Sequence, residues 1–157
     1  MRLFIFNTLL GLVWAALTGI FTPANFLAGF ILGFIMLSLA QSVFGKSSYA
    51  WRGYKLLTFL LFFTWELLKA NIRVAKDILT PKDYMTPGLI RLPLDAKSDI
   101  EITLLASIIS LTPGTLTIDV SADKKAMYIH AMYISDADDF RREIKEGFER
   151  RLLEVLR

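Results

Sequence analysis

The sequence predicts a membrane α-helical hairpin plus a third long helix, followed by a small α+β domain of βαββα order. Three observations predict this fold class. The chain has 157 residues, 54% of them hydrophobic, and a mean hydropathy of +0.48, which is too apolar for an ordinary soluble domain. Two long apolar runs come first, and turn signals separate short β-rich runs in the second half. We therefore divide the chain into a membrane-associated helical region, residues 1–80, and a soluble α+β domain, residues 81–157.

The first two helices are predicted from apolar runs at residues 3–21 and 26–44. Each run is close to the roughly 20 residues of a minimal membrane span. The turn Thr22-Pro23-Ala24-Asn25 is so short that the helices must be antiparallel neighbours. Arg2 and the first run also resemble a signal peptide, but a second apolar run follows at once without a good cleavage site before it. We expect an uncleaved hairpin, which either spans the bilayer or enters it only partway.

Small residues recur at a spacing of four on both helices of the hairpin. This spacing puts them on one helix face and lets backbones approach closely where no hydrophobic effect drives association. Glycine is also common in membrane helices for other reasons, so the pattern alone has low specificity. We expect packing, against the sister helix or another chain, at Gly11, Ala15, Gly19, Gly29 and Gly33.

The third helix is predicted to follow a polar loop with interfacial aromatic residues at 45–54. From Leu56 to Trp65 it is uncharged for about 15 Å, which is half a bilayer. Charged residues then share one face of the helix, where Glu66 can pair with Lys69, and Arg73 with Asp77. We call this face the charged stripe; it comprises Glu66, Lys69, Arg73, Lys76 and Asp77.

The charged stripe has two interpretations. In one, Glu66 is an intramembrane carboxylate that takes part in proton or cation movement. In the other, the helix leaves the membrane, Lys69 and Arg73 extend toward water, and the stripe docks on polar loops of a neighbour. We favour the second interpretation because one carboxylate followed by three bases is a poor relay.

The second half of the chain predicts the α+β domain. Residues 89–94 form a short strand whose Pro93 favours a sheet edge. Ser98 and Glu101 have the spacing of a capping box, which starts a helix that ends near Leu111. Strands at 115–120 and 126–134 should pair as a hairpin, and an amphipathic helix at 136–157 closes the domain. The helix after Ser98 is more apolar than a sheet can cover, which indicates contact with the membrane or a partner.

Several function classes are excluded by what the sequence lacks. Cysteine is absent and His130 is the only histidine, so neither a disulfide framework nor a cysteine or histidine zinc site is available. No P-loop, GxGxxG or nucleophile constellation is present. The basic residues of the first half flank apolar runs instead of forming a patch with aromatic residues, which argues against nucleic acid. We predict no enzyme activity, no cofactor and no metal.

Five stretches of the chain, in order, together resemble the E subunit of the Mrp-type multisubunit sodium/proton antiporters of bacteria: FTPAN, WELLKANIRVAKDIL, RLPLDAKSDIEITLLASIISLTPGT, TIDV and GFERRLLEV. The resemblance extends over nearly the whole chain, and the joint occurrence of the five stretches is more specific than any one of them. The resemblance implies an inner-membrane subunit of a hetero-oligomeric antiporter that exchanges external protons for cytoplasmic sodium. It also implies that larger subunits conduct the ions, and it supplies no catalytic residue.

We therefore expect an accessory subunit that supports assembly of such a complex, in contact with its other subunits and with lipid. The alternative is a self-contained small transporter or channel that uses Glu66. If all three helices span, the 45–55 segment and the C-terminal domain lie on opposite sides. Five bases near the far end of the third helix outnumber three in that segment, so the C-terminal domain is predicted to be cytoplasmic and the N-terminus external. Ser47 would then be exposed outside the cell and Asp123 inside.

Overall fold

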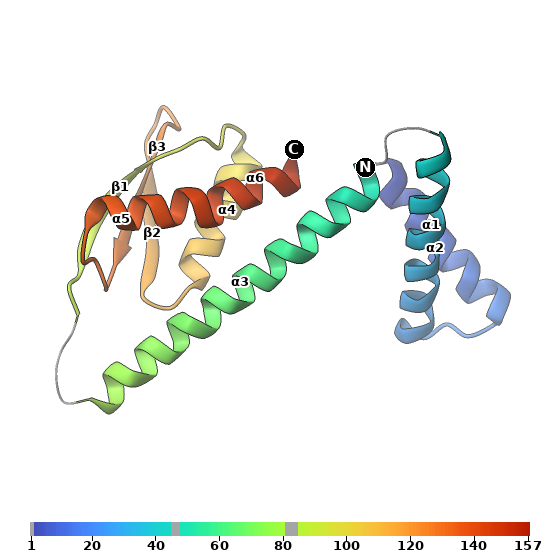
Figure 1. The fold of residues 1–157 in the computed structure, drawn as a ribbon, viewed down its shortest axis with the longest axis horizontal. Coiled ribbons are helices and arrows are strands. Elements are labelled where there is room, and N and C mark those ends of the chain that lie inside the picture. The colour runs from blue at the N-terminus through green and yellow to red at the C-terminus, as the bar shows by residue number, and fades with distance from the viewer. Residues whose placement is uncertain (1, 45–47, 81–84) are drawn as a thin grey trace. The chain divides into compact units, whose positions relative to one another are not determined.

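The structure, a computed structural model, describes residues 2–44, 48–80 and 85–157 (Figure 1). The protein is mostly helical with a small three-stranded sheet. Within the described ranges, one helix is long and apolar enough to span a membrane, over Pro23–Ala40, while Leu3–Thr18 is apolar but shorter. Contacts divide the chain into two compact units, residues 1–54 and 55–157. The predicted division at residue 80 follows the change in composition, whereas the third helix belongs to both compact units.

The first unit contains helices α1 (Arg2–Thr18) and α2 (Pro23–Phe44). Gly19 ends α1 with a φ of +71°, a left-handed conformation that favours glycine. Pro23 begins α2, where its missing N–H costs no helical hydrogen bond. Asn25 secures the turn, because its Nδ2 donates to Thr18 Oγ1 at 2.6 Å and its Oδ1 accepts from Trp14 Nε1 at 3.1 Å.

Helix α3 (Ser48–Leu79) is longer than predicted. The prediction of a loop over 45–54 is wrong for residues 48–54, which are helical, while 45–47 lie outside the described residues. Trp51 and Tyr54 are one turn apart on this helix, and their rings stack with centroids 5.5 Å apart. The polar and aromatic composition of the segment thus marks an exposed helical turn, not a break in the helix. At the other end, α3 stops two residues before Pro81, which cannot continue a helix.

The sheet has the order β1-β3-β2, with β1 (Gly88–Pro93), β2 (Thr115–Val120) and β3 (Ala126–Ala131) all antiparallel. The predicted pairing of the last two strands is confirmed, and Pro93 lies on an edge strand as expected. A bulge interrupts the β2–β3 register between Thr117 and Asp119. The last strand ends at Ala131, three residues earlier than predicted, and beyond it Thr86 forms an isolated bridge with Tyr133.

Helix α4 (Asp99–Leu111) begins with the predicted capping box. Ser98 Oγ accepts from the Glu101 backbone N–H, and a Glu101 carboxylate oxygen accepts from the Ser98 N–H. Ile102, Leu105 and Ile109 face the core, while Ile100 and Leu111 are exposed. The helix therefore keeps the excess apolar surface that its sequence indicates.

The predicted C-terminal helix is one helix of three parts, α5 (Ala137–Arg142), η1 (Glu143–Glu149) and α6 (Arg150–Leu156). The middle part, η1, is a π-helix, with wider turns than an α-helix. Ile144, Phe148 and Leu152 follow one another at steps of four, which drift around a 3.6-residue helix. The wider turn compensates for this drift, so all three side chains remain buried.

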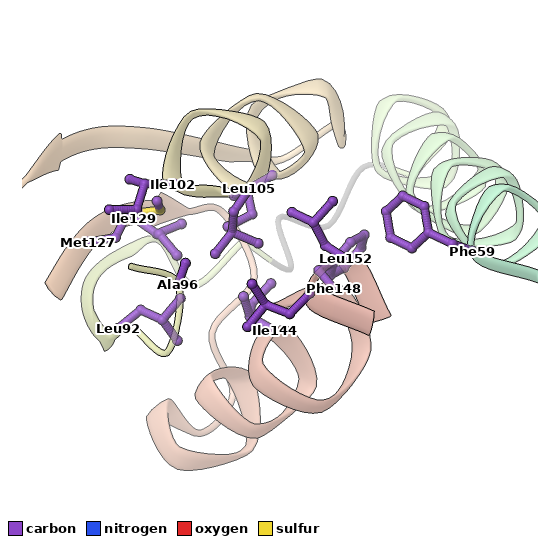
Figure 2. Close-up of a cluster of buried hydrophobic side chains, with 12 residues drawn as sticks. Phe59, Leu92, Ala96, Ile102, Leu105, Met127, Ile129, Ile144, Phe148 and Leu152 are labelled. Carbon is purple, nitrogen blue, oxygen red and sulfur yellow. The ribbon is translucent and has the colours of Figure 1, made fainter. Parts of the chain in front are cut away.

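The core of the second unit lies between the sheet, α4 and the C-terminal helix (Figure 2). Leu92, Met127 and Ile129 supply it from the sheet and are fully buried. Phe59 of α3 joins this cluster at 7% exposure, with Phe62 and Phe63 packed against it. Thus α3, from Lys55 onward, is a structural element of the α+β unit.

Candidate functional site

The small residues of the hairpin meet at the contact between α1 and α2. A Cβ on Gly29 would stand 2.5 Å from Trp14 Cβ, and one on Gly11 would stand 3.0 Å from the Phe26 ring. Ala15 is 2% exposed. These residues face the sister helix, one of the two partners considered for them. Gly19 differs, because nothing lies within 4 Å of its Cβ position and its role is in ending α1.

Asn7, a polar residue within the first apolar run, lies inside this contact. Its side chain is fully buried, and neither Oδ1 nor Nδ2 has a hydrogen-bond partner among the described residues. A Cβ on Gly33 would stand 2.5 Å from Asn7 Oδ1, so only glycine leaves space for the amide there. The GxxxG spacing that contains Gly33 signals a close approach, but it does not identify the polar group opposite.

One face of α3 packs against the C-terminal domain over much of its length. The Phe62 ring meets Phe148 edge-on at 5.4 Å, and the Arg151 guanidinium lies over the same ring at 4.4 Å. A Cβ on Gly147 would stand 3.2 Å from the tip of the Phe62 ring, so this ring packs against the backbone of the C-terminal helix there. This inner face comprises Phe59, Phe62, Phe63, Glu66, Lys69, Ala70, Arg73 and Asp77.

Four members of the charged stripe, Glu66, Lys69, Arg73 and Asp77, lie on this inner face toward the protein's own domain, whereas Lys76 is exposed. Lys69 Nζ is 2.7 Å from Glu66 Oε1, which confirms that predicted pair. The predicted Arg73–Asp77 ion pair is wrong: Arg73 lies over the Tyr133 ring at 5.4 Å, and the Tyr133 hydroxyl donates to Asp77. Tyr133 comes between the two charges, a contact that helical spacing alone does not reveal.

A cavity of about 70 Å³ separates part of the stripe from the domain. Two acids, Glu66 and Glu143, and two bases, Lys69 and Arg73, line it together with the turn after α4. The carbonyl end of α4 carries partial negative charge, which favours the two bases nearby. No group of three potential metal ligands occurs in the described part of the chain. The arrangement suits electrostatic docking of α3 on the domain.

A second charged cluster fixes the segment between β1 and α4. Glu149, 1% exposed, accepts at Oε1 from the backbone N–H groups of Asp95 and Ala96, at 2.6 and 2.9 Å. Its Oε2 lies 2.7 Å from Lys145 Nζ. Glu101 Oε2 accepts from the Lys97 and Ser98 N–H groups at 2.8 and 3.2 Å. Two carboxylates, Glu149 and Glu101, therefore bind the backbone N–H groups of four consecutive residues, 95–98. We call this arrangement the clamp.

Both carboxylates of this clamp are paired with cations, Lys145 of the C-terminal helix and Arg157 directly after it. Arg157 Nε donates to Glu101 Oε1 at 3.0 Å. Hydrogen bonds from Arg157, then from the Lys97 and Ser98 backbones, lower the pKa of Glu101 to about 2. Burial lowers the pKa of Lys145, but hydrogen bonds to Asp95 and Glu149 outweigh it, and the net pKa is raised. The sequence identifies Glu101 as a helix cap but does not reveal its other partners.

Comparison with known families gives a match over residues 7–155 to a family described as Na+/H+ ion antiporter subunit. The Na(+)/H(+) antiporter E subunit of Alkalihalophilus pseudofirmus is 37% identical over 149 residues, covering 95% of this chain and 94% of that protein. Its counterpart in Bacillus subtilis is also 37% identical, over 151 residues and 96% of each chain. The similarity extends over both compact units.

Two solved structures are similar to this one. A chain in the structure of the Mrp complex from Dietzia is 33% identical, with a TM-score of 0.51, over 65% of this chain and 96% of that chain. A chain of the membrane-bound sulfane sulfur reductase, an archaeal respiratory membrane complex, has a TM-score of 0.59 over 99% of both chains at 24% identity. The second likeness concerns the fold alone.

Proposed function

This chain belongs to the family of Na+/H+ antiporter E subunits, and from that premise we propose that it supports assembly of its complex and does not itself conduct ions. It is a subunit of a multisubunit antiporter complex, a membrane protein whose partners are the other subunits. Its relatives are antiporter subunits, which are transport proteins and not enzymes.

The direction of the charged stripe supports this proposal. An ion pathway through a membrane needs ionisable groups that face a transmembrane channel or one another along it. Glu66 instead pairs with Lys69, and the stripe continues to Arg73 and Asp77 against Tyr133 of the C-terminal domain. These charges fasten a helix to a domain. The charge pattern that suggests a relay in the sequence is explained by this docking.

We further propose that the α1–α2 hairpin lies in the inner membrane and that the C-terminal domain is cytoplasmic. The apolar span within α2 and the close contact of α1 with α2 support the first part. The bases around the far end of α3 support the second, because the positive-inside rule places such residues on the cytoplasmic side.

Charge substitutions in the assembled complex test the assembly role. Glu66→Gln keeps the shape of the side chain and removes its charge, and we expect sodium/proton exchange and its pH profile to remain. The double change Lys69→Glu with Arg73→Glu places acids beside Glu143 and the carbonyl end of α4. We expect it to lower the amount of assembled complex, measured by native gel electrophoresis of mild-detergent extracts.

Two outcomes would contradict the proposal. One is an exchange defect of Glu66→Gln in fully assembled complex, which would place this carboxylate in an ion pathway. The other concerns the alternative of a self-contained transporter. Such a protein would come out of mild detergent alone or as a homo-oligomer and conduct in liposomes, whereas an accessory subunit should purify with its partners.

A further inference from the structure

The outward face of α3, on the side away from Glu66, Arg73 and Asp77, is apolar from Leu57 to Leu79. At 100° per residue it lies on the far side of the helix from Phe59, Glu66 and Arg73. Its members are largely exposed, for example Leu61 at 63%, Trp65 at 61% and Leu79 at 84%. We call this the outer stripe; it comprises Leu57, Leu61, Trp65, Leu68, Ile72 and Leu79. The helix is thus apolar outside and charged toward its own domain, the reverse of a helix on a water-soluble protein.

The packing of α3 argues against a crossing of the bilayer by this helix. Contacts with the domain run from Phe59 to Asp77, about 27 Å at 1.5 Å per residue. A helix that spanned the hydrocarbon core along this length would draw the domain in with it. The domain presents exposed charges such as Arg142 and Asp139, and charge at the centre of a bilayer is costly.

We propose that α3 lies in the plane of the membrane surface, with the outer stripe immersed at the boundary between headgroups and acyl chains, and carries the C-terminal domain on its water-facing side. This inference rests on the proposed membrane hairpin and cytoplasmic domain. The outer stripe then contacts lipid, and contacts with other subunits are made by the rest of the surface.

Three features favour lipid as the occupant. The apolar helix α2 ends at Phe44 and α3 begins at Ser48, so at roughly 3.5 Å per residue the chain holds the start of α3 near the end of α2. Trp51, Tyr54 and Trp65 are exposed aromatic residues of the type that sits at headgroup level. Lys69 lies beside the outer stripe with 46% of its side chain exposed, as expected where a cation meets anionic headgroups.

This placement changes the expected topology. If α3 does not cross, the 45–55 segment and the C-terminal domain lie on the same side of the membrane. The bases at Lys46, Arg52 and Lys55 then lie in the cytoplasm together with those of the stripe, and neither group violates the positive-inside rule. Two crossings by the hairpin would put the N-terminus in the cytoplasm as well.

Spin labels measure the immersion of the outer stripe directly. Single cysteines replace Leu57, Leu61, Leu68 and Ile72 in a complex without other reactive cysteines, reconstituted in phosphatidylethanolamine and phosphatidylglycerol vesicles. Accessibility of each nitroxide to oxygen and to a water-soluble nickel chelate gives its depth. We expect all four labels to favour oxygen at one common shallow depth, and a control label at Asp123→Cys to favour nickel.

Two other patterns overturn the inference. Depth that rises and then falls from residue 57 to 72 means that α3 crosses the membrane. Low access to both reagents at all four positions means that a partner subunit covers the outer stripe. Both patterns are measured without antiport activity. A failure of this inference can therefore be distinguished from a failure of the proposed assembly role, which the charge substitutions test.

Cysteine labelling in intact cells provides a second readout. A membrane-impermeant maleimide should leave both Ser47→Cys and Asp123→Cys unlabelled until the membrane is opened. Labelling of one position and not the other in sealed cells contradicts the in-plane placement of α3.

Discussion

The hairpin and the C-terminal domain bury polar groups in opposite ways. In the hairpin, both amide atoms of Asn7 are buried without a hydrogen-bond partner among the described residues. In the domain, the buried Glu149 accepts two backbone N–H groups and pairs with Lys145. Charge-assisted bonds therefore fix the interior of the domain, whereas the fit of small residues fixes that of the hairpin.

The largest expected effect is in the domain. Glu149→Ala leaves the backbone N–H groups of Asp95 and Ala96 without their acceptor and leaves Lys145 with Asp95 as its remaining carboxylate partner. Removing one partner of a buried pair costs about 3–5 kcal/mol. We expect the free energy of unfolding of the domain to fall by this amount, measured by the urea dependence of its protease resistance in the purified complex. The exposed Glu154→Ala is the matched control, and a comparable loss there would show that the clamp has no special role.

A smaller effect is expected in the hairpin. Gly33→Leu forces a side chain against Asn7, and overpacking of this kind costs about 1–3 kcal/mol. The yield of assembled complex should fall, as measured by copurification with another subunit. Leu32→Ile, one residue away on an exposed position, should leave the yield nearly unchanged. Equal tolerance of both changes would remove the basis for a fit of small residues.

Acid should weaken the domain through Glu101. The pKa of this carboxyl is about 2 in the folded chain against an ordinary value of 4.5, so its contribution to stability is complete above pH 4.5 and is lost as the pH falls toward 2. The urea midpoint of the domain should therefore decrease across this window. Glu101→Gln should show a flatter pH dependence there, and an unchanged slope would contradict the role of its bond to Arg157.

The smallest effect is expected at Asn7. Leucine has a similar size and needs no hydrogen bonds, and apolar replacement of buried polar groups can be nearly neutral or stabilising. Asn7→Leu should therefore leave the yield of complex within error of the unchanged protein. A severe loss would mean that the amide has a partner in the assembled complex, and the contrast between the two regions would fail.

Local signals in the sequence predicted much of the domain. The capping box at Ser98 and the edge position of Pro93 depend on groups a few residues apart, and the structure contains both. The π-helix was harder to predict from the sequence. Core residues of the last helix recur at steps of four, which suits its wider turns, but the same spacing also fits an ordinary amphipathic helix.

The sites depend on contacts between distant residues, which periodicity does not encode. The spacing of Glu66 and Lys69 predicted their pair, yet Tyr133, which separates Arg73 from Asp77, comes from beyond β3. The small-residue spacing indicated close packing but not which helix or side chain lies opposite. Gly19 shares that spacing and instead ends a helix, because turn geometry and packing can use the same residue.

The clamp at the start of α4 also has a consequence for the order in which the parts of the chain fold. Backbone groups of residues 95 to 98 bind side chains at 149 and 101, and the cations that complete the clamp are at 145 and 157. During synthesis the hairpin leaves the ribosome long before these cations exist, and contacts so distant in sequence form late. Until they do, the inner face of α3 has no finished domain to pack against, so it stays uncovered until the chain is nearly complete.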